Sequence, residues 1–173
     1  MPDRGGRAGR TNIGDRIGAG WDADFLEARG LAVRRTDITN AFLQFQAERG
    51  KSAEKLDLID DDLGGPYDGI MALYVLQHVG RALVDGVLRK ISGALHPGGA
   101  FLAALREGEG EFCEEGKESG LYHIVLWTQA EFNERLAAAG LHTEQTALAT
   151  DEDGRWMILL ARKNAVKDTV RID

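Results

Sequence analysis

The residues of this chain that could bind or activate a ligand follow short apolar runs. Gly18-Ala19-Gly20 is a glycine turn, and the carboxylates of Asp37 and Asp57 lie at or near the ends of two later runs. His78 closes the next run. Each has an ordinary structural explanation, namely a turn, a helix cap, a solvated carboxylate or a helix-end hydrogen bond. Their shared position favours a ligand site, because open parallel sheets bind ligands beyond the carboxyl ends of their strands.

The stretch 66–105 contains the elements that must position such a site. Gly69–Leu76 is an apolar run behind a Gly-Gly-Pro breaker, and Arg81–Leu95 repeats apolar residues at helical spacing. The turn at 96–99 (His-Pro-Gly-Gly) stops that helix, and Ala100–Leu105 is a second apolar run of strand length. Strand, helix and strand predict a βαβ unit, with parallel neighbouring strands joined by a right-handed crossover.

The rest of the chain continues this alternation and predicts an open α/β domain. Continuously apolar runs are typical of parallel sheets, which helices cover on both faces. The folded part should end in an antiparallel hairpin, because two extended runs flank the polar turn at 151–154. The other predicted elements are a strand at Thr11–Ile17, a helix at Asp22–Arg29 capped by Asp22, a strand at Leu31–Thr36, a helix from Thr39 or Asn40 to Glu48, a strand at Lys55–Ile59, a polar loop at 106–120, an extended run at Leu121–Trp127, a helix capped by Thr128 with Glu131, and hairpin strands at Leu141–Ala149 and Arg155–Arg162.

Composition limits the classes of protein to which this chain can belong. It has 173 residues, 43% of them hydrophobic, and we expect one domain at 11–162 between a flexible arm, 1–10, and a polar tail, 163–173. The net charge of −7 argues against binding to duplex nucleic acid, which normally requires a basic face. A single cysteine, Cys113, argues against a disulfide framework and a cysteine-rich metal site, so we expect no metal.

The hydropathy pattern gives an expectation for cellular location. No run approaches the roughly 18 apolar residues that a membrane span requires, so we expect no membrane interaction. The start of the sequence lacks the apolar core of a secretory signal, and we therefore expect a cytoplasmic protein.

One stretch also carries a family resemblance. YDGIMALYVLQHV, followed by an amphipathic helix and LHPGGAFL, resembles the middle of class I S-adenosylmethionine-dependent methyltransferases. In that family an aromatic-Asp pair opens strand 4, an apolar-His-Val segment follows, and a Pro-Gly-Gly turn leads into strand 5. The resemblance covers about residues 18–162. It implies a three-layer, Rossmann-like fold with a mostly parallel sheet and a C-terminal antiparallel hairpin.

The resemblance implies S-adenosylmethionine as the cofactor and assigns residues to it. Asp37, with Ile38 beside it, would accept hydrogen bonds from the ribose hydroxyls, because a carboxylate only accepts and can bridge two donors. Asp57 and Leu58 match the pair beside the adenine. The remaining matches are the glycine loop at Gly18, Ala19 and Gly20, the strand end near the methionine portion at Ala72 and Leu73, and the family histidine at His78.

The reaction implied is displacement of a methyl group from a sulfonium to a nucleophile on a small-molecule acceptor. The leaving group is already good, so positioning in a dry pocket supplies most of the catalysis. The segment 106–127 would form a lid and a substrate wall. The candidates for catalytic contact with the acceptor are His78, Tyr74, Tyr122 and His123.

Two departures from the family pattern leave other functions open. Trp21 follows Gly20 directly, so the third glycine of the family loop is missing, and the usual N-terminal helix is missing as well. The alternative is a degenerate methyltransferase-like domain with weak or no cofactor binding, serving as a partner or non-catalytic subunit. A nicotinamide-dependent Rossmann enzyme is a third reading, which the lack of a substrate domain disfavours.

The N-terminal strand decides whether the predicted sheet is complete. We expect Thr11–Ile17 to add a short central strand, because an uncovered central strand edge invites aggregation. The alternatives are a gap filled by another chain, such as a second copy in a homodimer, or a gap that abolishes cofactor binding.

Overall fold

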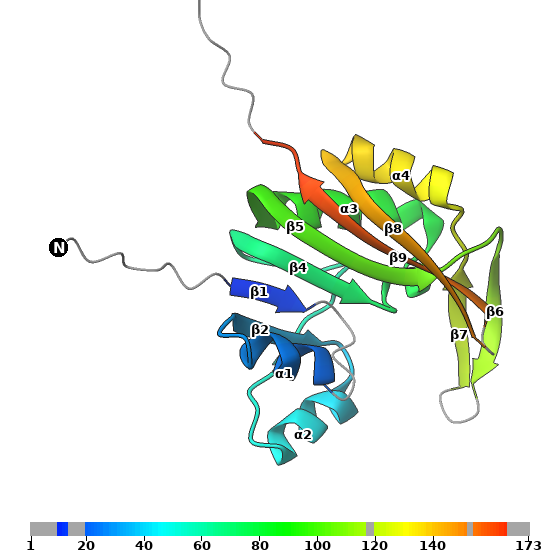
Figure 1. Ribbon diagram of the computed structural model, residues 1–173. Helices are drawn as coiled ribbons and strands as arrows, with labels where there is room; N and C mark the ends of the chain where they lie inside the picture. The colour runs from blue at the N-terminus through cyan, green and yellow to red at the C-terminus, as the bar shows by residue number, and fades with distance from the viewer. Residues whose placement is uncertain (1–9, 14–19, 117–119, 152–153, 166–173) are drawn as a thin grey trace, which may run out of the picture.

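The chain folds around a seven-stranded sheet with helices on both faces (Figure 1). The structure, a computed structural model, describes residues 10–13, 20–116, 120–151 and 154–165. The sheet has the order β3-β2-β1-β4-β5-β9-β8. Its strands are β1 (Arg10–Ile13), β2 (Ala32–Asp37), β3 (Glu54–Lys55), β4 (Tyr67–Leu73), β5 (Leu95–Arg106), β8 (Leu141–Asp151) and β9 (Gly154–Lys163). The other elements are the β6–β7 hairpin (Glu111–Gly116, Gly120–Val125), the helices α1 (Trp21–Glu27), α2 (Asn40–Glu48), α3 (Arg81–Ala94) and α4 (Gln129–Ala138), and the 3₁₀ turn η1 (Leu76–His78).

The short strand β1 lies at the centre of the sheet, where the expected N-terminal strand belongs. It pairs in parallel with both β2 and β4, and Ile13 lies opposite Arg35 on one side and Met71 on the other. The strand covers Arg10–Ile13 rather than Thr11–Ile17, and the remainder of the predicted range lies outside the described part. A strand of the same chain therefore joins β2 to β4.

The strands β4 and β5 are parallel neighbours, as the βαβ pattern predicts, and α3 connects them. The register places Ile70 opposite Phe101. β5 begins earlier than predicted, because Leu95 pairs with Tyr67 before the register shifts. The helix stops before the predicted turn at 96–99, and these four residues form an unpaired bend inside β5, in which Gly98 has φ +77°.

The last two strands form the predicted antiparallel hairpin. β9 pairs antiparallel with β8 on one side and with β5 on the other, so β8 and β5 run in the same direction. Leu159 lies opposite Ala103 of β5 and Thr146 of β8. Among the described strands of the sheet, β9 is the one that runs against its neighbours.

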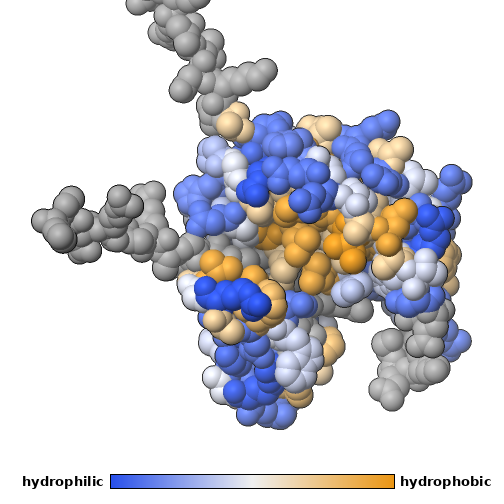
Figure 2. Space-filling model, in the orientation of Figure 1, coloured by the Kyte–Doolittle hydropathy of each residue, from blue (hydrophilic) through white to orange (hydrophobic). Residues whose placement is uncertain are grey.

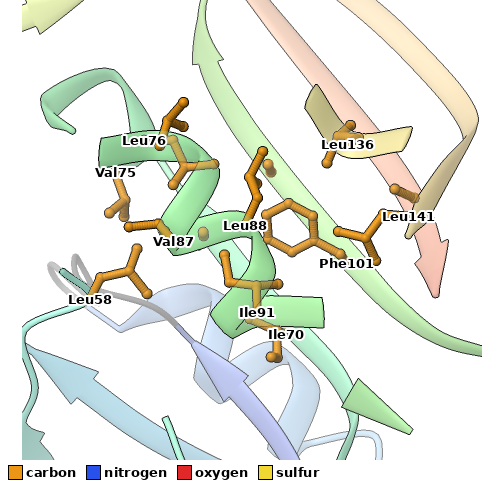
Figure 3. Close-up of a cluster of buried hydrophobic side chains, with 14 of the residues drawn as sticks. Leu58, Ile70, Val75, Leu76, Val87, Leu88, Ile91, Phe101, Leu136 and Leu141 are labelled. Carbon is orange, nitrogen blue, oxygen red and sulfur yellow. The ribbon is translucent and has the colours of Figure 1, made fainter. Parts of the chain in front are cut away.

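The main apolar core lies on the sheet face that α3 and α4 cover (Figure 1). Val87, Leu88 and Ile91 of α3 are buried, as their helical spacing predicts. Phe101 of β5 is fully buried among them, and Leu136 of α4 completes the group (Figure 3). Each such side chain stabilises the fold by about 1.5–3 kcal/mol through its burial.

The opposite face of the sheet is covered unevenly. α1 and α2 lie over the β2 end, and α1 reaches Met71 of β4, whereas no helix of the described part lies over β5 and β9 on this side (Figure 1). Met71, Leu73 and Leu102 pack against each other and α1 there. Figure 2 shows an apolar surface in this region. The second core is therefore much smaller than the first.

Two local predictions before β4 are wrong. Gly20, and not Asp22, is the N-cap residue of α1, and Asp22 lies in its first turn. The third strand covers Glu54–Lys55 and does not reach Ile59. It ends early because the side chain of Asp61 accepts a hydrogen bond from the Asp57 N–H and turns the chain.

The segment 106–120, predicted as a polar loop, contains a strand. β6 pairs antiparallel with β7, and Cys113 lies directly opposite His123. The predicted cap of the following helix is confirmed, because Thr128 Oγ1 accepts a hydrogen bond from the Glu131 N–H at 3.2 Å.

The predicted ends of the domain are only partly within the described residues. The arm, 1–10, lies outside them except for Arg10, which belongs to β1. In the tail, 163–173, Lys163 closes β9 and its ammonium group donates to the Leu95 carbonyl at 2.7 Å. None of the helices in the described part is long and apolar enough to cross a membrane.

Candidate functional site

A cavity of about 220 Å³ lies at the carboxyl ends of the parallel strands. Its lining residues follow β2 (Ile38 and Thr39), β3 (Asp57 and Ile59) and β4 (Val75, His78 and Val79). Three residues that the sequence pattern singled out, Ile38, Asp57 and His78, are therefore brought together by three different strands. This is the edge at which open α/β sheets bind their ligands.

A larger cavity, about 600 Å³, lies at the amino ends of β2 and β4. Arg34, Arg35 and Glu54 are the charged residues that line it, but Glu54, the Leu63 carbonyl and the Tyr67 hydroxyl already bind the Arg34 guanidinium at 2.7–3.1 Å. We assign the site to the smaller cavity, because the predicted residues converge on it and the sheet topology favours its edge.

Asp37 is the last residue of β2 and is fully buried beside the cavity. Its Oδ1 accepts a hydrogen bond from the Thr39 N–H at 2.7 Å, which holds the turn into α2. Oδ1 of Asp37 therefore has the structural role of a turn residue. It does not conflict with ligand binding, because a carboxylate has two oxygens and about four acceptor positions.

Asp57 and Leu58 have different surroundings, although the resemblance assigns both to the adenine. Asp57 lines the cavity, and its Oδ1 accepts from the Ile59 N–H at 2.8 Å. Leu58 is 1% exposed and points into the main core (Figure 3). The apolar side chain that lines the cavity at this place is Ile59. Lys90 fixes the turn by donating to the Leu58 and Ile59 carbonyls at 3.2 and 2.9 Å.

The glycine turn is described only at its last residue, because Gly18 and Ala19 lie outside the described part. Gly20 has φ +77°, which favours glycine, and an added Cβ would lie 2.6 Å from Gln46 Nε2 and 2.8 Å from Arg35 Nη1. Its carbonyl accepts from the Asp24 N–H at 3.0 Å. The fold therefore requires glycine at this position irrespective of a ligand.

The end of β4 carries Ala72, Leu73 and Tyr74. Ala72 is fully buried in the main core, and Leu73 packs on the opposite face of the sheet. Tyr74 has φ 62° and is 46% exposed, and its N–H donates to the Ala104 carbonyl at 2.7 Å. Its ring packs edge-on against Trp156, with 5.1 Å between the ring centres. Sequence analysis missed Trp156, whose only local signal was an aromatic residue at the start of the last strand.

His78 closes η1 and lines the cavity. Its Nδ1 lies 2.9 Å from the His123 carbonyl oxygen, which can only accept, so Nδ1 carries a proton. Its Nε2 lies 3.4 Å from the Gln77 amide nitrogen, which can only donate. These contacts hold the Nδ1 edge of the ring against the His123 carbonyl and leave the Nε2 edge facing the Gln77 side chain.

The β6–β7 hairpin supplies the other two predicted catalytic residues. The Tyr122 ring packs against the His78 ring with 5.7 Å between centres. Its hydroxyl donates to Glu114 at 3.0 Å, and Arg106 donates to the same carboxylate oxygen at 3.0 Å. His123 contacts His78 through its backbone, whereas its own imidazole lies 2.8 Å from Glu111.

Comparison with known proteins agrees with this architecture. A family model for a methyltransferase domain matches residues 17–101. An S-adenosylmethionine-dependent methyltransferase from Methanosarcina mazei has a similar structure, with a TM-score of 0.77 at 14% identity over 90% of this chain and 92% of that chain. A search of curated proteins found no significant match.

Two similar structures contain bound ligands. The 1,6-didemethyltoxoflavin-N1-methyltransferase of Burkholderia thailandensis, with bound 1,6-didemethyltoxoflavin and S-adenosylhomocysteine, has a TM-score of 0.71 at 20% identity, over 92% of this chain and 72% of that chain. Magnesium protoporphyrin IX methyltransferase from Synechocystis PCC 6803, with bound S-adenosylhomocysteine, has a TM-score of 0.70 at 15% identity, over 91% and 74%. With the observed strand order, these structures show that the chain has the fold of class I S-adenosylmethionine-dependent methyltransferases, and its residues 17–101 match the methyltransferase-domain family.

Proposed function

We propose that the protein transfers a methyl group from S-adenosylmethionine to a small organic acceptor at the carboxyl edge of its sheet. The observation that carries the proposal is the cavity that joins Ile38, Asp57 and His78. The two relatives named above with bound ligands act on small molecules, 1,6-didemethyltoxoflavin and magnesium protoporphyrin IX. Both have the same fold as this chain.

The cavity suits the adenosine end of the cofactor. Its volume of about 220 Å³ is below the roughly 300–1,000 Å³ of complete ligand pockets, so it would hold part of the molecule. Ile38 and Ile59 offer apolar walls to a purine ring, and the Asp57 carboxylate can accept from an exocyclic amine. The methionine portion would then extend towards Gly20 and the end of β4.

Asp37 is the proposed ribose ligand. It is buried next to the cavity residues Ile38 and Thr39, so a hydroxyl bound there would be shielded from water. A hydrogen bond to such a carboxylate contributes about 1.5–3 kcal/mol. The same residue also holds the turn, so a test must keep the bond from the Thr39 N–H.

The protein's own residues would act mainly by position. When bound, the cofactor supplies an electrophilic methyl group on a sulfonium, and the chain must exclude water and orient the acceptor. His78 is the proposed proton acceptor for a protonated nucleophile, because its imidazole lines the cavity and the His123 carbonyl fixes its Nδ1 edge. The Tyr122 ring fixes the orientation of the His78 imidazole.

Calorimetric titration with S-adenosylhomocysteine tests the cofactor site. Asp37→Asn keeps an oxygen for the Thr39 N–H but loses the charge, and we expect affinity to fall about ten-fold or more. Asp68→Asn is a matched control, because Asp68 is exposed at the opposite end of β4. We expect that control to bind like the wild type.

The same titration separates an active enzyme from a degenerate domain. Absence of measurable binding by the wild type would overturn the proposal and favour a non-catalytic role. Equal affinity in Asp37→Asn and Asp68→Asn would remove Asp37 from the site but leave the cofactor in place.

A further inference from the structure

Tyr74 holds an unusual conformation at the end of β4. It is the one non-glycine residue with positive φ in the described part, at 62°. Left-handed backbone is unfavourable for a bulky side chain, and such residues concentrate at functional sites. The ring is 46% exposed, so core packing does not explain why an aromatic residue is kept there.

Trp156 gives that ring a fixed partner from the other end of the chain. The two rings are nearly perpendicular, at 87°, with 5.1 Å between their centres. The Trp156 indole N–H donates to Asp151 Oδ1 at 2.8 Å, which fixes the orientation of the indole. Tyr74 and Trp156 therefore form a rigid corner, which we call the aromatic corner, with one ring edge and one ring face.

A second aromatic pair lies on the far side of the β4 end. His78 and Tyr122 pack at 64°, and Tyr122 reaches Glu114 and, through it, Arg106. Arg106 is the register partner of Trp156 across β5 and β9. The second pair is therefore connected, through Glu114 and Arg106, to the strand position opposite Trp156.

The charged groups beside the corner are the Asp151 carboxylate, which accepts from the Trp156 indole, and the pair formed by Arg106 and Glu114. The Arg106 guanidinium lies 3.0 Å from the Glu114 carboxylate, and the Tyr122 hydroxyl donates to the same oxygen. Such a pair adds no net charge, so it offers little attraction to a phosphate or a carboxylate group. The large aromatic surface instead favours a flat, uncharged ligand, because rings pack on rings in stacked or edge-to-face geometry.

We propose that the methyl acceptor is a planar aromatic compound, held against the aromatic corner of Tyr74 and Trp156. This inference rests on the proposed function, because it places the acceptor next to the cofactor cavity. Tyr74 directly precedes Val75, which lines that cavity. Along the backbone, the corner is therefore one residue away from the cavity lining at the β4 end.

The test compares two probes that share a carbon skeleton and a hydroxyl group. 2-Naphthol is planar and aromatic, whereas decahydro-2-naphthol is saturated and puckered. Saturation-transfer NMR on the full chain, with S-adenosylhomocysteine present, should show binding of 2-naphthol about five-fold tighter than that of the saturated alcohol. Equal binding of the two probes would overturn the inference.

Variants then assign the preference to the corner. Trp156→Ala should reduce 2-naphthol binding about five-fold, and Trp156→Phe should retain most of it. Trp21→Ala is the control, because Trp21 is 70% exposed on α1. This variant should bind 2-naphthol as tightly as the wild type does. Unchanged binding in Trp156→Ala would remove the corner from the acceptor site.

Tyr74→Gly separates a binding role from a structural one. Glycine accepts φ 62° without strain, so the variant should fold at least as stably as Tyr74→Ala in thermal melts. It should nevertheless lose the preference for 2-naphthol, and a retained preference would contradict the proposal.

S-adenosylhomocysteine titration distinguishes a failure of the acceptor inference from a failure of the proposed function. Trp156→Ala should bind it within about two-fold of the wild type, because the corner lies outside the adenosine cavity. Cofactor binding without a planar preference would defeat the acceptor inference alone. A planar preference without cofactor binding would defeat the proposed function and leave an aromatic binding site.

Discussion

The two ends of the sheet are attached to their helices by different forces. At the β4–β9 end, α3 and α4 pack through an apolar core that includes Val87, Leu88, Ile91 and Phe101 (Figure 3). Towards the β1–β3 end, the smaller apolar group has, among the described residues, Ala23 of α1 and Met71 of the adjoining β4 as its buried members, with a few partly buried neighbours. Ionic contacts supply most of the remaining attachment there.

Arg35 of β2 is the centre of this ionic group. Its guanidinium is 1% exposed and contacts Asp24 at 2.6 Å, Glu27 at 2.9 Å and Gln46 at 3.0 Å. Arg49 bonds to the second oxygen of Asp24. We call these residues the arginine cluster. They join α1 and α2 to the middle of β2.

The pKa values of the cluster follow from these contacts. Hydrogen bonds from Arg35, and then from Arg49, lower the pKa of Asp24 to about 2. A hydrogen bond from Arg35 also lowers the pKa of Glu27, against the opposing effect of its burial. Burial opposes the charge on Arg35, but the hydrogen bonds to Glu27 and Asp24 outweigh it and raise its pKa. All three groups therefore stay charged.

The difference matters because the proposed cofactor site spans both regions. Asp37 and Gly20 belong to the ionic end, whereas His78 and Tyr74 belong to the apolar end. The helices α1 and α2 have only 7 and 9 residues, too few to be stable alone, so their position depends on the arginine cluster. Changes to that cluster should affect cofactor binding without melting the rest of the sheet.

Phe101→Ala should have the largest effect on stability. The side chain is fully buried in the main core, so we expect a loss of about 3–5 kcal/mol in unfolding free energy, measured by urea denaturation. Phe25→Ala is the control, because that ring is 56% exposed and should cost under about 1 kcal/mol. Similar losses in both variants would contradict the assignment of the core.

Arg35→Ala should be the next largest change, at about 3 kcal/mol, because it leaves Asp24 and Glu27 without their buried counter-charge. Hydrogen exchange should accelerate in α1 and β2 but not in α3 and β5. The triple variant Arg35→Met, Asp24→Asn and Glu27→Gln should recover most of the loss. If Arg35→Ala were as stable as the wild type, the arginine cluster would not be required for stability.

Gly20→Ala should cost about 1–2 kcal/mol, because alanine is strained at φ +77° and its Cβ would displace Gln46 and Arg35. Cofactor affinity should fall as well, since the turn lies at the cofactor end of α1. Gly30→Ala provides the control: it has a similar φ, +83°, but nothing within 4 Å of an added Cβ. Equal stability losses would mean that strain alone, and not contact with the cluster, requires glycine at position 20.

Acidification should have the smallest effect and should reach the ionic end first. Asp24 has a pKa of about 2 in the folded chain and about 3.9 when unfolded, so its contribution is complete above about pH 5 and is lost as the pH falls towards 2. We expect a loss of about 1 kcal/mol after solvent screening. Amide NMR spectra should change in α1 before α3, and Asp24→Asn should remove that early transition. Simultaneous spectral changes in α1 and α3 would contradict the prediction that the ionic end responds to acid first.

The sequence by itself determined the elements whose signals are local. The apolar spacing of α3, the flanking β4 and β5, the C-terminal hairpin and the Thr128 cap each depend on residues a few positions apart. The resemblance also placed Asp37, Asp57 and His78 at strand ends, and the structure brings them to one edge. Periodicity and turn residues carry this information because they act over one or two turns of chain.

Tertiary structure alone decided the features that depend on distant partners. The glutamates of β6 mask its strand pattern in the sequence, and the strand forms because β7 pairs with it. Arg35 looks like a solvated charge in the sequence, yet α1 and α2 enclose it. Tyr74 meets Trp156 across 82 positions of sequence, a pairing that only the β5–β9 register creates. Contacts at such separation leave no periodic trace, because the sheet, and not the local chain, sets which residues become neighbours.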